Sequence, residues 1–207
     1  MISDKYKFIF VHIPKTGGQS IFKLFHPYKK NWWRHYKAGV THEEVYTTDV
    51  VDSHFCWSVV RNPWSRIVSE YVWGMRWYLR PRNKKQPQMS FSDFVKSFNS
   101  YDEIGYPESE KSHLWLQTEC IERAVGSLDA MDFICRLENY QSDFDTVCEK
   151  LNIPKRKLPK SNSTSRGTYK PHKLYDHYTE YYDDETREIV AEKYAKDIEY
   201  FGYKFGE

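Results

Sequence analysis

The sequence lacks any apolar segment long enough to cross a membrane, and no such run opens it, so we expect neither a signal peptide nor a membrane anchor. Cysteine is scarce, with four residues in 207 and no Cys-x-x-Cys pair, which argues against a disulfide framework and a zinc site. The formal net charge is only +2, so no general attraction to nucleic acid or a membrane surface is expected. Cys56 and Cys135 lie in apolar runs, where buried and reduced thiols are expected, so we predict a cytoplasmic protein.

Internal repeats and low-complexity tracts are also absent, and the length suits a single domain over residues 1–207. Short apolar runs that predict strands alternate with periodic segments that predict helices. The expected strands are 6–13, 55–60 and 131–137. The expected helices are 20–25, a brief one from 41, 63–79, 91–98, 111–122, 140–151 and 184–200. This alternation predicts an α/β fold with a P-loop-like central parallel sheet flanked by helices.

The first expected strand runs into a loop whose residue types suit an anion. Glycines allow backbone N–H groups to converge, and the helix start adds partial positive charge. The loop differs from the nucleoside-triphosphate pattern GxxxxGK[ST], because its lysine precedes its glycines. A plain turn remains the alternative. The candidate residues are Lys15, Thr16, Gly17, Gly18, Gln19 and Ser20.

The second expected strand ends at Arg61, and Ser69 follows eight positions later on the next expected helix. A guanidinium and a hydroxyl can bind a phosphate monoester by charge-assisted hydrogen bonds. Alternatively, Arg61 forms an ordinary ion pair and Ser69 is solvated. Because parallel strands end at the same edge of a sheet, these residues and the first loop could grip two anionic ends of one nucleotide.

Two stretches, FVHIPKTGGQS and SVVRNPWSRIVSEY, resemble the 5′-phosphosulfate loop and the 3′-phosphate motif of sulfotransferases that use 3′-phosphoadenosine 5′-phosphosulfate (PAPS). The resemblance is especially to the Golgi glycan enzymes and their short bacterial relatives. Weaker similarity continues through HLWLQ, DFICRLENY and DIEYFGYKF. The resemblance implies metal-independent transfer of a sulfonate group from PAPS to a hydroxyl of an acceptor, with carbohydrates among the candidates and 3′,5′-adenosine bisphosphate as the product.

The same resemblance implies roles for individual residues. Lys15 would contact the 5′-phosphate and the sulfonate, and the loop residues up to Ser20 would complete that site. Arg61 and Ser69 would hold the 3′-phosphate, and Arg166 with Gly167 matches a basic loop that folds over it.

A base should take the proton of the acceptor hydroxyl, and histidine suits this role at neutral pH. His35, in the stretch between the two motifs, matches the placement seen in relatives, while His42, His54 and His12 stay open. The basic run Arg80–Lys85 could attract an anionic acceptor or be simply solvated.

Two other functions stay open at this point. One is an ATP-dependent small-molecule kinase with a P-loop-like fold, which would require Mg²⁺. The other is a non-catalytic module that binds a nucleotide or a glycan. The sequence does not specify an oligomeric state.

Overall fold

The computed structural model describes residues 1–25, 46–77, 89–99, 108–159 and 175–207. The chain forms two compact units. We call the first the sheet unit, which comprises Met1–Arg61 and Trp115–Asn162, and the second the helical unit, which comprises Asn62–Leu114 and Ser163–Glu207. Each is described by itself.

The sheet unit contains a mainly parallel sheet, which confirms the predicted α/β class. Its strands are β1 (Ile2–Ser3), β2 (Phe8–Val11), β3 (Phe55–Val60) and β4 (Phe133–Arg136), in the order β1-β2-β3-β4. The pairs β2–β3 and β3–β4 are parallel, with Val11 opposite Ser58 and Val60 opposite Arg136. The three parallel strands lie within the predicted runs. The antiparallel edge strand β1 was not predicted, because two residues are too short to show a periodic pattern.

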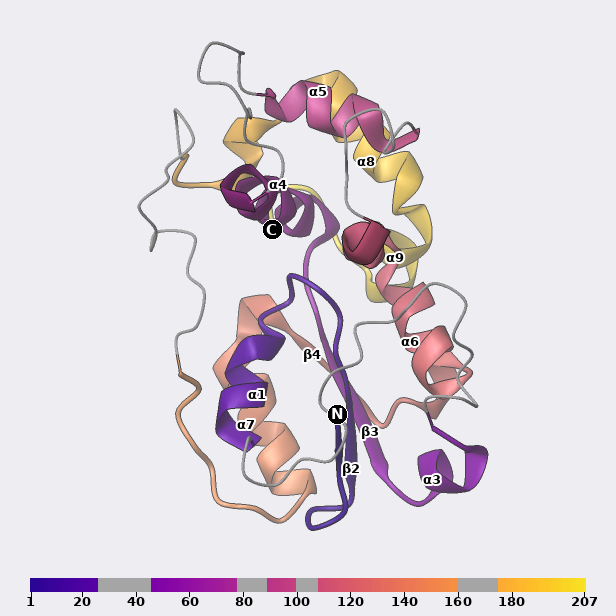
Figure 1. Ribbon diagram of the computed structural model, residues 1–207. Coiled ribbons are helices and arrows are strands. Elements are labelled where there is room, and N and C mark those ends of the chain that lie inside the picture. Colours follow the sequence, from indigo (N-terminus) through magenta and orange to yellow (C-terminus); the bar gives the residue numbers. More distant parts are fainter. Residues whose placement is uncertain (26–45, 78–88, 100–107, 160–174) are drawn as a thin grey trace. The chain divides into compact units, whose positions relative to one another are not determined.

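Helices cover both faces of this sheet (Figure 1). Helices α1 (Gly18–Phe25) and α7 (Tyr140–Lys150) lie on one face, and α6 (Gln117–Val125) lies on the other. The remaining helical pieces are α3 (Thr48–Asp52), η4 (Leu128–Ala130) and η5 (Leu137–Asn139). A strand covered on both faces needs apolar residues throughout, and all four residues of β2 are buried.

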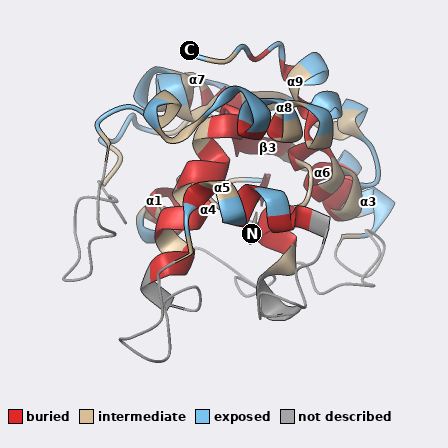
Figure 2. Ribbon diagram, turned by 90° about the horizontal axis from the view of Figure 1, so that it is seen from above, coloured by how far each residue is buried: buried red, intermediate tan, exposed pale blue. Residues whose placement is uncertain are grey.

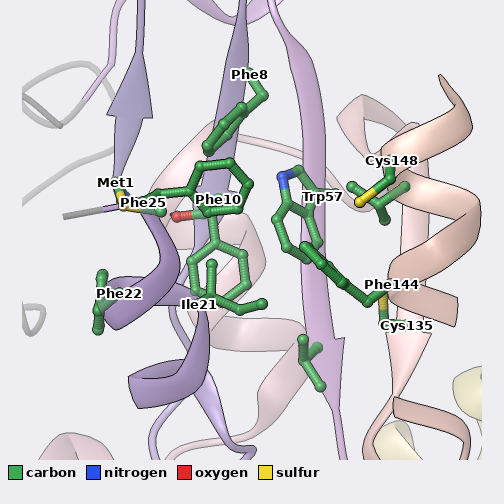
Figure 3. Close-up of a cluster of buried hydrophobic side chains, with 12 residues drawn as sticks. Met1, Phe8, Phe10, Ile21, Phe22, Phe25, Trp57, Cys135, Phe144 and Cys148 are labelled. Atoms are coloured by element: carbon green, nitrogen blue, oxygen red, sulfur yellow. Dashed lines mark hydrogen bonds between the residues drawn. The ribbon is translucent and has the colours of Figure 1, made fainter. Parts of the chain in front are cut away.

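Aromatic rings fill the core between the sheet and the α1–α7 layer (Figure 3). Trp57 on β3 lies between Phe10, with ring centroids 4.6 Å apart, and Phe144 of α7, at 6.0 Å. All four cysteines of the chain are buried and free of disulfides. Burial raises the pKa of the Cys135 thiol, so this residue stays a protonated, apolar filler at neutral pH.

The helical unit is built on α4 (Pro63–Trp77), which Figure 2 shows buried along most of its length. The Asn62 side chain accepts from the backbone N–H groups of Trp64 (3.2 Å) and Ser65 (3.4 Å), so Asn62 caps the helix and Pro63 takes its first position. The other elements are α5 (Phe91–Lys96), η2 (Ser97–Asn99), η3 (Glu108–Leu114), η6 (Tyr178–Tyr181), α8 (Asp184–Lys193) and α9 (Ala195–Phe201).

Buried polar contacts tie α4 to its neighbours within the helical unit. Glu70 and Arg66 are fully buried, and His113 is 6% exposed. The His113 Nδ1 lies 3.0 Å from a Glu70 carboxylate oxygen, and the Arg66 guanidinium donates to the His113 carbonyl at 2.9 Å. Charged groups are rarely buried unless paired in this way, so these contacts fix η3 against α4.

Two predicted helices are each divided in the structure. The segment 111–122 contains the end of η3 at Leu114 and the start of α6 at Gln117. The segment 184–200 is broken at Tyr194, where φ is −108° and ψ is 23°. The Tyr194 ring is fully buried and its hydroxyl donates to the Leu114 carbonyl at 2.9 Å. Tertiary packing therefore overrides helical periodicity at this residue. The brief helix expected from residue 41 begins outside the described residues.

The aromatic core should dominate the stability of the sheet unit. We expect Phe144→Ala to lower the free energy of unfolding by about 3–5 kcal/mol, because it removes a fully buried ring and leaves a cavity. Ser142→Ala on the exposed face of α7 is the matched control, with an expected change within about 0.5 kcal/mol. Denaturant unfolding measures both, and equal effects would contradict this view of the core.

Candidate functional site

The loop between β2 and α1 has an unusual backbone. Lys15 has a φ of 69° and Gly17 a φ of 88°, so both adopt left-handed conformations separated by a single residue. Such alternation turns successive N–H groups toward a common point. Helix α1 begins at Gly18, and the N–H groups in the first turn of a helix have no acceptors within that helix. The loop therefore forms a backbone cradle with positive electrostatic character.

Close packing explains both glycines of this cradle. A Cβ atom on Gly18 would lie 2.2 Å from Nδ1 of His12. A Cβ atom on Gly17 would lie 2.8 Å from Cδ1 of Leu137 and 3.0 Å from Cε1 of Tyr140. Gly17 also needs its positive φ. Side chains from other elements thus hold the loop where only glycine fits.

Three hydroxyl groups fix the shape of the cradle. Thr16 donates to the carbonyl of Ile13 at 2.9 Å, and Ser20 donates to the carbonyl of Pro159 at 2.7 Å. Tyr140 donates to the carbonyl of Gly17 at 2.9 Å. Burial raises the pKa of Tyr140, so its hydroxyl keeps the proton that it donates. The hydroxyls of Thr16 and Ser20, expected to face a donor anion, bind protein carbonyls here.

Arg61 joins the second strand end to this cradle. It directly follows β3, and its Nη1 donates to the backbone carbonyl of Lys15 at 3.3 Å. Both residues belong to the sheet unit. The carboxyl ends of two adjacent parallel strands therefore meet through a charged side chain, which is the arrangement expected for a ligand site in an open α/β sheet.

A residue that sequence reasoning did not select holds the backbone of Arg61. The Gln117 side chain accepts from the N–H of Arg61 and donates to its carbonyl, both at 2.9 Å. The only sequence signal was the position of Gln117 at the end of the weakly similar stretch HLWLQ.

Several expected site residues lie in the other unit or outside the described residues. Ser69 is half-buried on α4 in the helical unit, whereas Arg61 ends a segment of the sheet unit. His35, His42, Arg166, Gly167 and the run Arg80–Lys85 lie outside the described residues. Their roles stay predictions.

Two of the alternative candidates for the base, His54 and His12, lie among the described residues. His54 precedes β3, so the six residues of that strand, about 20 Å long, separate it from Arg61. Its Nδ1 lies 2.8 Å from the Val50 carbonyl oxygen. The His12 ring packs against Gly18 and lies 4.9 Å from the Phe22 ring. This geometry argues against His54 as the base.

Within the described residues, no group of three or more His, Cys, Asp or Glu side chains could hold a metal ion. In the same part of the chain, no helix is both long and apolar enough to cross a membrane.

The tight fit around Gly18 gives a test of the cradle. We expect Gly18→Ala to lower the free energy of unfolding by about 1–3 kcal/mol, because the new methyl group would overlap the His12 ring. In a His12→Ala background the same change should cost much less. A double-mutant cycle by denaturant unfolding measures the coupling, and equal costs in both backgrounds would show that the ring is not the obstacle.

The chain is similar in sequence to known proteins. A sequence profile of the sulfotransferase family matches residues 1–204. An uncharacterized protein of Archaeoglobus fulgidus is 26% identical over 119 residues, which are 58% of this chain and 85% of that protein. No solved structure matches the chain significantly. Because the profile covers nearly the whole length, the chain belongs to the sulfotransferase family, whose general activity is sulfonate transfer.

Proposed function

We propose that this sulfotransferase takes its sulfonate group from PAPS and transfers it to a hydroxyl of an acceptor. The observation that carries the proposal is the 3.3 Å hydrogen bond from the Arg61 guanidinium to the Lys15 carbonyl. This bond brings a side chain of the type that binds phosphate strongly to the edge of the backbone cradle. A nucleotide with anions at its 5′ and 3′ ends has the charge pattern that such a pair of sites suits.

The chemistry of the loop fits the 5′-phosphosulfate end. The cradle is made from main chain around Gly17 and Gly18, and backbone N–H groups bind phosphate and sulfate oxygens without regard to side-chain type. Lys15 adds a full positive charge from within the loop. We assign the 5′ end of PAPS to residues Lys15, Thr16, Gly17, Gly18, Gln19 and Ser20, with Thr16 and Ser20 shaping the loop through their hydroxyls.

Arg61 fits the 3′-phosphate end. A guanidinium has five N–H donors in a planar fork, a geometry that suits the oxygens of a phosphate monoester. By the family resemblance, Ser69 supplies a hydroxyl to the same phosphate, and Arg166 with Gly167 covers it. PAPS supplies an activated sulfonate group, and the residues of the chain bind and orient it.

The transfer forms a bond between the acceptor oxygen and sulfur, and breaks the bond between sulfur and the oxygen of the 5′-phosphate. Negative charge grows on that leaving oxygen, and the Lys15 ammonium would stabilise it. The acceptor hydroxyl loses its proton to a base, for which we propose His35. Holding the two reactants in line supplies much of the remaining acceleration. We propose a carbohydrate among the candidate acceptors, a cytoplasmic location, and Arg80–Lys85 as a segment that attracts an anionic acceptor.

Ligand-induced stabilisation tests the choice of donor. We expect saturating 3′,5′-adenosine bisphosphate to raise the melting temperature by about 5 °C or more, and ATP with Mg²⁺ to raise it less. A larger effect of ATP with Mg²⁺ would favour the kinase alternative. A screen of hydroxyl acceptors with radiolabelled PAPS then distinguishes an enzyme from a module that binds without turnover.

Lys15 offers the sharpest test of the chemistry. We expect Lys15→Ala and Lys15→Gly to lower the rate of sulfonate transfer about 10²–10³-fold, because each removes the charge facing the leaving oxygen. Lys15→Gly should keep the loop shape, since glycine tolerates the left-handed backbone at this position. The measurement is transfer from labelled PAPS, with melting temperature as the control for folding. Activity close to wild type in Lys15→Gly would refute a chemical role for the ammonium.

A further inference from the structure

Gln117 holds the backbone of Arg61 at two points. Its side-chain oxygen accepts from the Arg61 N–H, and its side-chain nitrogen donates to the Arg61 carbonyl, each at 2.9 Å. An amide side chain can accept through its oxygen and donate through its nitrogen from one planar group. All of these atoms lie in the sheet unit.

The position of Arg61 explains why this contact matters. The parallel register of β3 with β4 ends at Val60, so Arg61 lies one residue beyond the ladder. Backbone N–H and C=O groups away from water need partners, and Gln117 supplies both at this residue. The contact thus fixes the backbone of Arg61, the residue directly after β3, and with it the position from which the guanidinium extends.

Gln117 is itself held rigidly. It is the first residue of α6 and is fully buried, and Cys120, Ile121 and Ala124 of the same helix are also fully buried. The amide therefore has little freedom to turn away from Arg61. On the other side of Arg61, the guanidinium is fixed to the Lys15 carbonyl at 3.3 Å. Both ends of Arg61 are held from within the same unit.

From this geometry we infer that Gln117 is a positioning residue that aims Arg61 and so sets the preference for a donor with a 3′-phosphate. The inference rests on the proposed function, in which Arg61 binds that phosphate. Gln117 acts through the Arg61 backbone and does not touch the donor. Losing its contacts should therefore weaken recognition of the 3′-phosphate more than recognition of the rest of the nucleotide.

The experiment compares two ligands that differ only in this group, 3′,5′-adenosine bisphosphate and adenosine 5′-monophosphate, by calorimetric titration. We expect Gln117→Met, which keeps the side-chain volume but forms no hydrogen bonds, to lower the affinity ratio of the two ligands about tenfold. Phe144→Ala is the matched control, because it weakens the core without touching Arg61 and should keep the wild-type ratio.

A double variant tests whether the effect passes through Arg61. If it does, Gln117→Met should not lower the ratio further in an Arg61→Ala background. An additional loss of similar size there would show that Gln117 acts independently of Arg61, and would overturn the inference.

Gln117→Glu gives a second test, which does not require the fold to accommodate methionine at this buried position. A protonated carboxyl group both donates and accepts, as the amide does, whereas a carboxylate only accepts. Burial beside the Arg61 carbonyl should raise the pKa of the introduced carboxyl group. The readout is again the ratio of the affinities for the bisphosphate and the monophosphate. We expect this ratio in Gln117→Glu to approach the wild-type ratio, measured at the same pH, as pH falls. A ratio that stays equally far from that of wild type as pH falls would contradict the inference.

Failure of the inference and failure of the proposed function give different results. If wild type does not prefer the bisphosphate, the proposed donor is wrong. If wild type prefers it and Gln117→Met retains the full ratio, the donor assignment stands and only the role of Gln117 falls.

Discussion

The candidate site depends on one constraint, which is that polar backbone groups just beyond the end of a parallel strand still need partners. β2 and β3 lie side by side and end at the same edge of the sheet. Beyond that edge, side chains replace the missing ladder bonds. Tyr140 binds the carbonyl of Gly17, Arg61 binds that of Lys15, and Gln117 binds both backbone groups of Arg61. The same contacts that satisfy the backbone also place the charged groups.

The helical unit also has buried polar groups that need partners, and here side chains on and around α4 supply them. Arg66, Glu70 and His113 are buried together on and around α4, where each polar group has a described partner. Buried polar contacts add little net stability compared with apolar packing, but removing one partner is costly because it leaves the other buried without its hydrogen bond. Their effect is to fix how η3 packs against α4. Aromatic contacts, such as that of Tyr71 with Phe91 at 5.4 Å, supply the apolar part of the packing.

The sequence was sufficient for the three parallel strands and for the start of α4, because apolar runs and the Asn62-Pro63 pair are local signals. It also indicated that Lys15 and Arg61 would approach each other, since each follows a strand of a sheet that was expected to be parallel, and such strands end at the same edge. The break at Tyr194 could not be predicted, because it arises from a bond to Leu114, which lies 80 residues earlier. Gln117 was missed for the same reason, since its partner is 56 residues away in the sequence. Contacts between distant segments leave no periodic trace.

The hydrogen-bonded hydroxyls of the cradle have a consequence for binding affinity. Thr16, Ser20 and Tyr140 hold the loop through bonds to three different carbonyls before any anion arrives. An anion that enters such a loop loses little affinity to the conformational entropy of ordering it. This saving in conformational entropy should apply equally to the binding of sulfate-like and phosphate-like groups. Discrimination between nucleotides then falls to groups farther along the ligand.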